Sequence, residues 1–210
     1  KDLFVTGTDT DVGKTVLAAT LTLGLDAVYW KPIQTGVQAG TTPSDREVVA
    51  TLTNLPQNRL LPETYIFDPP VSPHLAADRS GITINLATIV KPSVNGRRLI
   101  IEGAGGILVP INRKEMMLDL ALHLDTSVII ATRTSLGTIN HTLLTVETIR
   151  RNGLDPIGVV MIGKENIDNR NAIERYGQLP VVGWIPPLET LDHTNLLEVF
   201  KSHFDEHSFN

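Results

Sequence analysis

The segment FVTGTDTDVGKTVLAA, residues 4–19, constrains the fold more than any other part of the chain. An apolar strand at its start leads through a loop bounded by glycines into a helix that begins at Lys14. Backbone N–H groups at such a helix start form an anion site, and the helix dipole adds to it. Lys14 can reach the β- and γ-phosphates of a nucleotide, and the Thr15 hydroxyl can ligate Mg²⁺. The segment therefore predicts a phosphate-binding loop; the alternative is a glycine-capped turn with an exposed lysine.

The loop departs from the strict pattern G-x-x-x-x-G-K-[ST] in both length and charge. Five residues, not four, separate Gly7 from Gly13, and two of the five are the acids Asp9 and Asp11. Because carboxylates repel a polyanion, the two acids need a role other than phosphate binding.

Length and composition fit a single domain spanning residues 1–210. The 210 residues are 41% hydrophobic and 20% charged, an ordinary globular balance for a chain that can bury its own core. The formal net charge is −5 and no Lys/Arg run exceeds two residues, which argues against nucleic acid or an anionic membrane as a partner.

Cysteine usage and hydropathy exclude further classes of protein. The sequence has no cysteine, so disulfides, thiolate metal sites and a cysteine nucleophile are excluded, and we expect a cytoplasmic location. No apolar stretch approaches the ~20 residues that a membrane span needs, and we expect no signal peptide before Leu3.

Short β-branched apolar runs alternate with helical patterns along the chain. Near-continuous apolar strands between helices predict an α/β fold with a doubly wound, mainly parallel sheet flanked by helices. Ligands of such sheets bind at the carboxyl ends of the strands. The expected strands are 3–6, 27–31, 64–67, 98–102, 127–132, 157–162 and 181–185, and the expected helices are 14–24, 45–53, 84–91, 116–124, 138–152, 167–176 and 194–204.

Polar residues follow several of these expected strands. Lys31, in YWKPIQTG, points a cation into the crevice of Lys14, and Glu102, in LIIEGAGG, closes a buried strand where a Mg²⁺ ligand belongs. Asp45 begins a helix within PSDREV. The alternatives are a surface lysine, a solvated glutamate in a tight turn, and an ordinary N-cap by Ser44 or Asp45.

Together these residues form a set suited to phosphoryl transfer, with cations for charge and oxygens for Mg²⁺. The six histidines lack metal-ligand spacing, so zinc is not expected, and no Ser-His-Asp arrangement is recognisable.

Five segments in order resemble dethiobiotin synthetase: TGTDTDVGKT, KPIQTG, SPH, EGAGG and LGTINHTLLT. The similarity covers nearly the whole chain, and the long G-x5-G-K-T loop is itself a mark of that family. The resemblance implies a P-loop NTPase-like fold and a reaction of 7,8-diaminopelargonate, CO2 or bicarbonate, and ATP with Mg²⁺. A carbamate would attack the γ-phosphate to form a carbamic–phosphoric anhydride, and ring closure would release phosphate beside ADP.

The resemblance also implies a role for individual residues. The catalytic residues would be Lys31, Lys14 and Thr10, and the metal ligands Thr15, Asp45 and Glu102. The substrate residues would be Thr10, Asp11, Lys31, Thr35, Gly137, Thr138, Ile139 and Asn140. The nucleotide residues would be Asp11, Val12, Gly13, Lys14, Thr15, Val16, Asp45, Glu102, Gly103, Ala104, Gly105, Gly163, Pro186, Pro187 and Leu188.

A homodimer with a shared active site is a further implication. In the family, the helix start that corresponds to Gly137–Asn140 comes from the other subunit and holds the substrate carboxylate, whereas the sequence alone favours an ordinary loop with Thr138 as N-cap. The diamine substrate is cationic until it reacts, so Thr10 and Asp11 can turn towards its amines while Asp9 braces the turn. His74 would line the substrate cleft; a buried structural histidine fits equally.

The chain departs from the family pattern in three places. Asp11 stands where Glu is common, MIGKEN (161–166) replaces an Asn-Asp pair that reads adenine, and Pro187 stands where an aromatic residue can occur. ATP is the expected nucleotide, with CTP or a relaxed preference as alternatives.

Three other functions share part of this pattern. A ParA/MinD-like regulatory ATPase carries Lys at the second position of the strict loop frame, where this chain has Asp9, and its basic membrane-targeting helix is absent. A glutaminase-coupled amidoligase needs a cysteine, and a small-metabolite kinase leaves EGAGG and LGTINH unexplained.

Overall fold

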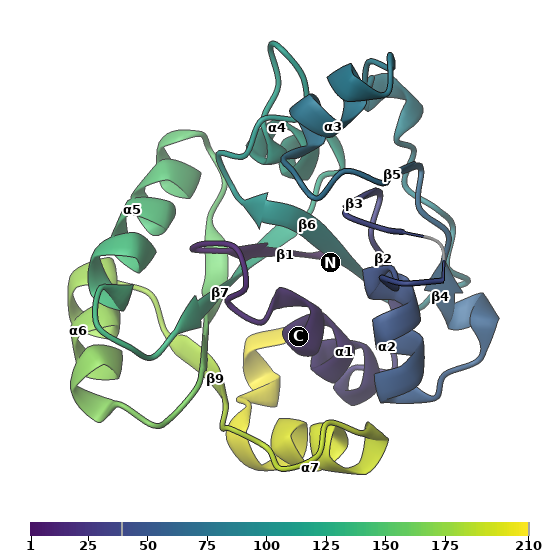
Figure 1. Cartoon of the computed structure of the whole chain (residues 1–210). Helices are drawn as coiled ribbons and strands as arrows, with labels where there is room; N and C mark the ends of the chain where they lie inside the picture. Colours follow the sequence, from purple (N-terminus) through teal and green to yellow (C-terminus); the bar gives the residue numbers. More distant parts are fainter. Residues whose placement is uncertain (39, 210) are drawn as a thin grey trace.

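The computed structural model describes residues 1–38 and 40–209 and contains one large parallel sheet (Figure 1). Its strand order is β4-β2-β6-β1-β7-β8-β9, and every neighbouring pair is parallel. The strands are β1 (Leu3–Gly7), β2 (Val28–Trp30), β4 (Leu60–Leu61), β6 (Leu99–Gly106), β7 (Ser127–Arg133), β8 (Pro156–Ile162) and β9 (Val181–Ile185). The predicted doubly wound α/β fold is confirmed.

Helices cover both faces of this sheet (Figure 1). One face carries α1 (Lys14–Gly24), α2 (Asp45–Thr53) and α7 (His193–His203). The other carries α3 (Pro73–Arg79), α4 (Met117–His123), α5 (Thr138–Arg151) and α6 (Ile167–Gly177).

Strand periodicity divides the core between these two layers. Successive side chains of a strand point to opposite faces, so Phe4 packs with the α3–α6 layer while its neighbours Leu3 and Val5 pack with the α1, α2 and α7 layer. All three are at most 2% exposed. A sheet buried on both faces explains why its strands are almost uninterrupted apolar runs.

The structure corrects the predicted helix 84–91. Only a 3₁₀ turn, η2 (Leu86–Thr88), forms there, and the Asn85 side chain accepts a hydrogen bond from the Ala87 N–H. Pro92 disfavours helical backbone at the residue before it. Ile84 and Ile89 are fully buried, so tertiary packing fixes the segment in an irregular form.

The segment predicted as strand 64–67 forms, but outside the main sheet. It is β5 (Tyr65–Phe67), and it pairs with β3 (Ile33–Thr35) in a separate parallel ribbon of two strands. The short elements β3, β4, η1 (Gln57–Arg59), η3 (Glu206–Phe209) and helix α3 were not predicted. Pro73 at the first turn of α3 is a helix-start signal that the sequence offered.

In the parts of the chain that the structure describes, no helix is both long and apolar enough to span a bilayer.

Candidate functional site

A cleft of about 500 Å³ opens where β1, β2 and β6 end. Residues from five separate segments meet in it, because the carboxyl ends of parallel strands lie at one edge of the sheet. Among the residues predicted from sequence, those that line it are Thr10, Asp11, Lys14, Lys31, Thr35, Asp45, Glu102, Ala104 and Gly105.

The phosphate loop connects β1 directly to α1. Gly13 has φ +94°, and a Cβ there would lie 2.9 Å from Cδ1 of Ile162, so only glycine fits at this position. The Lys14 ammonium donates to the Asp9 carbonyl at 3.2 Å and so folds back over its own loop. Burial lowers the pKa of Lys14 below its ordinary value, although the carboxylates of Glu102 and Asp45 oppose that effect.

The acid Asp9 fixes the shape of the long loop. One of its carboxylate oxygens accepts the Thr10 backbone N–H at 2.7 Å, and the other accepts an Nη2 hydrogen from Arg133 at 2.8 Å. Arg133 is the last residue of β7, so the ion pair ties the loop to the neighbouring strand. By contrast Asp11 is exposed at the cleft with φ 57°, and it forms no ion pair among the residues that the structure describes.

The most buried charges of the site centre on Lys31. Its ammonium donates to the carboxylates of both Asp45 and Glu102, the latter at 3.0 Å, and its side chain is 7% exposed. Burial by itself lowers the pKa of Lys31, but the two carboxylates outweigh that effect and raise the pKa above its ordinary value. Lys31 is therefore a fixed cation at neutral pH.

Glu102 collects donors from three elements. Its Oε1 accepts from Lys31 and also from the Thr15 hydroxyl at 3.0 Å, while Oε2 accepts from the Tyr29 hydroxyl at 2.8 Å. We expected Glu102 to close its strand, and this was wrong: β6 continues to Gly106, so Glu102 lies inside it. Its fully hydrogen-bonded, buried position excludes the alternative of a solvated glutamate.

The oxygens of this cluster suit a hard divalent cation. Mg²⁺ takes oxygen ligands and is commonly bound through one or two carboxylates together with substrate phosphates. Thr15, Asp45 and Glu102 supply such oxygens beside the phosphate loop. Within residues 1–38 and 40–209 no group of three or more His, Cys, Asp or Glu side chains is arranged as a metal site.

The start of α2 shows which of Ser44 and Asp45 is the N-cap. Ser44 is the N-cap: its hydroxyl accepts from the Glu47 N–H, and the Glu47 carboxylate accepts from the Ser44 N–H. Asp45 is thus free of capping and turns its carboxylate to Lys31. Gln34 adds a further constraint, because its side-chain oxygen accepts the Asp45 N–H at 3.2 Å.

The remaining predicted residues lie at the edges of this site. Gly163 follows β8, whose Ile162 packs against Gly13, and Pro186, Pro187 and Leu188 follow β9. The end of β8 therefore borders the phosphate loop through Ile162, but none of the four residues lines the cleft.

The start of α5 differs from the predicted capping. Its N-cap is Gly137, not Thr138, whose hydroxyl is buried and donates to the Arg133 carbonyl at 2.5 Å. Thr132 lies within hydrogen-bonding distance of both Thr138, at 2.8 Å, and Thr8 of the phosphate loop, at 3.1 Å. The residues Gly137, Thr138, Ile139 and Asn140 do not line the cleft of their own chain.

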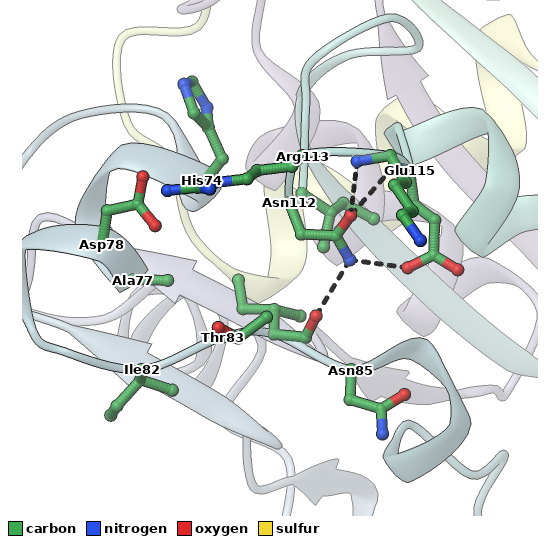
Figure 2. A pocket seen from close by; sticks show the side chains of 12 residues that line it. His74, Ala77, Asp78, Ile82, Thr83, Asn85, Asn112, Arg113 and Glu115 are labelled. Atoms are coloured by element: carbon green, nitrogen blue, oxygen red, sulfur yellow. Dashed lines mark hydrogen bonds between the residues drawn. The ribbon is translucent and has the colours of Figure 1, made fainter.

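A second cavity, of about 830 Å³, lies outside this site between α3 and residues 111–115 (Figure 2). His74 lines it rather than the cleft, whereas Ser72 and Pro73 line the cleft. Asn112 fixes one wall by donating to the Ile84 carbonyl at 2.9 Å. This cavity is larger, but the converging cations and carboxylates are in the cleft, so we assign the chemistry there.

Sequence reasoning missed Tyr29, Arg133 and Gln34. Only Tyr29 gave a usable signal: it precedes Lys31 by two residues, and residues two apart in a strand share a face.

Two solved structures share this fold at low sequence identity. A ParA family ATPase from Chlorobium tepidum aligns with a TM-score of 0.58 at 14% identity, covering 96% of this chain and 93% of that one. MinD in a MinC:MinD complex from Aquifex aeolicus aligns with a TM-score of 0.55 at 13% identity, covering 95% and 87%. At such identities the likeness shows the fold alone.

Sequence relatives are far more similar. A family model described as an AAA domain matches residues 1–195. An ATP-dependent dethiobiotin synthetase of Rhodopseudomonas palustris strain HaA2 is 43% identical over 209 residues, covering 100% of this chain and 96% of that protein. One from Paramagnetospirillum magneticum is 48% identical over 188 residues, covering 90% and 89%. Identity at this level over the full length, together with the long phosphate loop, places the chain in the dethiobiotin synthetase family.

Proposed function

We propose that this chain, acting as one domain, uses ATP and Mg²⁺ to carboxylate 7,8-diaminopelargonate and close its ureido ring to dethiobiotin. The observation that carries the proposal is the buried Lys31 ammonium, held by Asp45 and Glu102 at the floor of a cleft that Lys14 shares. Family membership at 43% identity supports the same reaction.

Each chemical step conserves atoms and uses only the three substrates. One amine of the diamine adds to CO2 and loses a proton, which gives a carbamate. A carbamate oxygen attacks the γ-phosphorus, the bond from that phosphorus to the ADP oxygen breaks, and a carbamic–phosphoric anhydride forms. The second amine then attacks the carbonyl carbon and gives up a proton to solvent, phosphate leaves with the oxygen it gained, and the ring closes.

The side chains of the cleft have separate tasks in this scheme. Lys31 would hold the carbamate carboxylate, since its pKa stays high and its position is fixed by two carboxylates. Lys14 would offset charge on the transferred phosphoryl group, and its bond to the Asp9 carbonyl would be exchanged for one to phosphate. Mg²⁺, when bound, would neutralise further charge on the phosphates. Most of the rate enhancement would come from placing carbamate and phosphate in line.

Thr10, Asp11 and Thr35 would bind the diamine. All three line the same cleft, and Asp11 presents an exposed carboxylate there. A carboxylate attracts a cationic amine and repels phosphate, so Asp11 suits the diamine side of the cleft. The nucleobase would lie near Gly163 and Pro186–Leu188, with ATP as the expected nucleotide.

We further propose a homodimer in which the start of α5 binds the substrate carboxylate of the partner's site. The N–H groups at residues 137–140 do not face the cleft of their own chain. Leu136, beside them, is 99% exposed, and the exposed side chains of Leu108 and Leu144 line one shallow depression nearby. Exposed leucines beside a helix start are typical of a surface that another subunit covers.

The test of the reaction is phosphate release with 7,8-diaminopelargonate and bicarbonate, run in parallel with ATP, CTP and GTP. Diamine-dependent release, with dethiobiotin identified by mass spectrometry, is the expected result. Nucleotide hydrolysis that ignores the diamine would instead favour a regulatory ATPase of the kind that shares this fold. Absence of diamine-dependent release with all three nucleotides would refute the synthetase assignment.

Mixed dimers test the shared site. Lys31→Ala and Asn140→Ala are expected to be impaired separately, whereas remixed subunits should regain roughly a quarter of wild-type turnover, because random pairing makes one dimer in two a heterodimer with one intact site. If both residues act within one chain, mixing restores nothing.

A further inference from the structure

We propose that Tyr29 is a positioning residue that holds the Glu102 carboxylate in the orientation required for a divalent cation. The inference rests on the proposed Mg²⁺–ATP site and adds to it a residue that lies behind the metal ligands. Tyr29 does not line the cleft, so it acts through Glu102 and not on the substrates.

The contact joins two neighbouring strands of the main sheet, β2 and β6. Tyr29 lies on β2 and pairs in register with Ile100 of β6, two residues before Glu102. The tyrosine is 0% exposed and Glu102 is 1% exposed, and the hydroxyl donates to Oε2 at 2.8 Å. A buried tyrosine hydroxyl needs a partner, and here the partner is a carboxylate, which makes the bond stronger than one between neutral groups.

The two oxygens of Glu102 have different surroundings. Oε1 accepts from Thr15 and Lys31, both of which belong to the proposed catalytic site. Among the residues that the structure describes, Tyr29 is the only donor to Oε2. The tyrosine therefore binds Oε2 and leaves Oε1 directed towards the Thr15 hydroxyl.

Tyr29 prevents rotation of the Glu102 carboxylate. The terminal torsion of a glutamate is broad, so the carboxylate is not oriented by its own rotamer. Without the hydroxyl, Oε2 would be a buried acceptor with no partner, and the carboxylate would turn to share it with Lys31 or Thr15. The Tyr29 hydroxyl is the donor of this bond, because a carboxylate can only accept.

Tyr29→Phe tests the inference, because it removes one oxygen and keeps the ring. We would measure ATP affinity by calorimetry in EDTA and across a Mg²⁺ titration. ATP affinity in EDTA should stay within twofold of wild type. Mg²⁺ is expected to increase ATP affinity, and the Mg²⁺ concentration that gives half of this increase should rise about ten- to hundredfold. This is the usual loss of metal affinity when a hydrogen-bond partner behind a metal ligand is removed.

Trp30→Phe is the matched control on the same strand. Trp30 is 2% exposed and faces the opposite layer, where its Nε1 donates to the Pro62 carbonyl at 3.0 Å. The variant loses one partly buried hydrogen bond but makes no change next to Glu102. Its melting temperature in EDTA should fall, while its Mg²⁺ dependence stays that of the wild type.

A double-mutant cycle separates positioning from general destabilisation. In a Glu102→Gln background, Tyr29→Phe should cause no further change in Mg²⁺ dependence, because the two residues act as one unit. The inference is overturned if Tyr29→Phe leaves the Mg²⁺ midpoint within twofold of wild type, if Trp30→Phe shifts it equally, or if the two effects add. A wild-type protein whose ATP affinity ignores Mg²⁺ would overturn the proposed metal site itself.

Discussion

Replacing Lys31 with methionine should abolish most turnover while leaving nucleotide binding intact. Methionine keeps a long unbranched side chain but removes the ammonium that joins Asp45 to Glu102. The Lys31 side chain is 7% exposed, so water cannot replace the lost cation. The substitution therefore isolates the charge of Lys31 from its volume.

The magnitudes follow from the burial of the three partners. Breaking a buried ion pair from one side costs about 3–5 kcal/mol. The lower end applies because the Asp45 side chain is 27% exposed and Glu102 keeps its bonds from Tyr29 and Thr15. At roughly 2–4 °C per kcal/mol for a chain of this size, a loss of about 3 kcal/mol lowers the melting temperature by roughly 6–12 °C.

Turnover should fall by about 10²–10³-fold, the typical loss for one preorganised group that stabilises developing charge. ATP affinity in the presence of Mg²⁺ should be unchanged or higher, since Asp45 and Glu102 would no longer be neutralised by an ammonium. This opposite response of turnover and affinity distinguishes a catalytic cation from a residue that only supports the fold.

The assays are thermal unfolding in EDTA, phosphate release with saturating diamine and bicarbonate, and calorimetry with Mg²⁺ and ATP. Lys91→Met is the matched control: Lys91 pairs with Asp2 at 3.1 Å, both side chains are partly exposed, and exposed pairs contribute about 0–1 kcal/mol. A Lys31→Met enzyme whose kcat stays within a few-fold of wild type would refute the assigned role. A Lys31→Met melting temperature equal to that of the wild type would refute the stabilising role of the buried ion pairs that Lys31 forms.

Three further substitutions probe separate parts of the cleft. Lys14→Ala should reduce turnover by orders of magnitude, measured as phosphate release, because it removes preorganised charge at the γ-phosphate. Asp11→Asn should weaken diamine binding and largely spare ATP binding in calorimetry; the reverse result would place this carboxylate on the phosphate and metal side. Asn140→Ala should raise KM for the diamine more than KM for ATP in steady-state kinetics, and the opposite order would contradict the carboxylate assignment.

The sequence predicted the catalytic edge of the sheet well, because local signals there agree with the global fold. Helix 14–24 was predicted with its observed ends, since Gly13 can adopt a left-handed conformation that precedes a helix start. Lys31, Asp45 and Glu102 lie far apart in sequence, yet each follows or belongs to a strand or helix at the carboxyl edge of one parallel sheet. Topology alone therefore predicted that they meet.

What the sequence did not predict depends on tertiary contacts. Helix 84–91 has suitable apolar spacing, but Ile84 and Ile89 are buried in an irregular segment that ends before Pro92. The β6 strand continues to Gly106 because Gly7 of β1 pairs with Gly106 beyond a register shift, although the glycine-rich sequence disfavours a strand there. In both cases tertiary packing, which depends on the whole fold, overrides the local secondary-structure propensity.

The extra residue of the phosphate loop can be explained by the two acids it contains. The Asp9 carboxylate accepts hydrogen bonds from the Thr10 N–H and from Arg133 at the end of β7, so it connects the longer loop to the neighbouring strand. Asp11, two residues later, has a left-handed backbone and an exposed carboxylate at the cleft. A loop of the strict length has one position fewer between its glycines. Because one acid is used for structure, the longer loop still has a second acid free for a cationic substrate beside the phosphates.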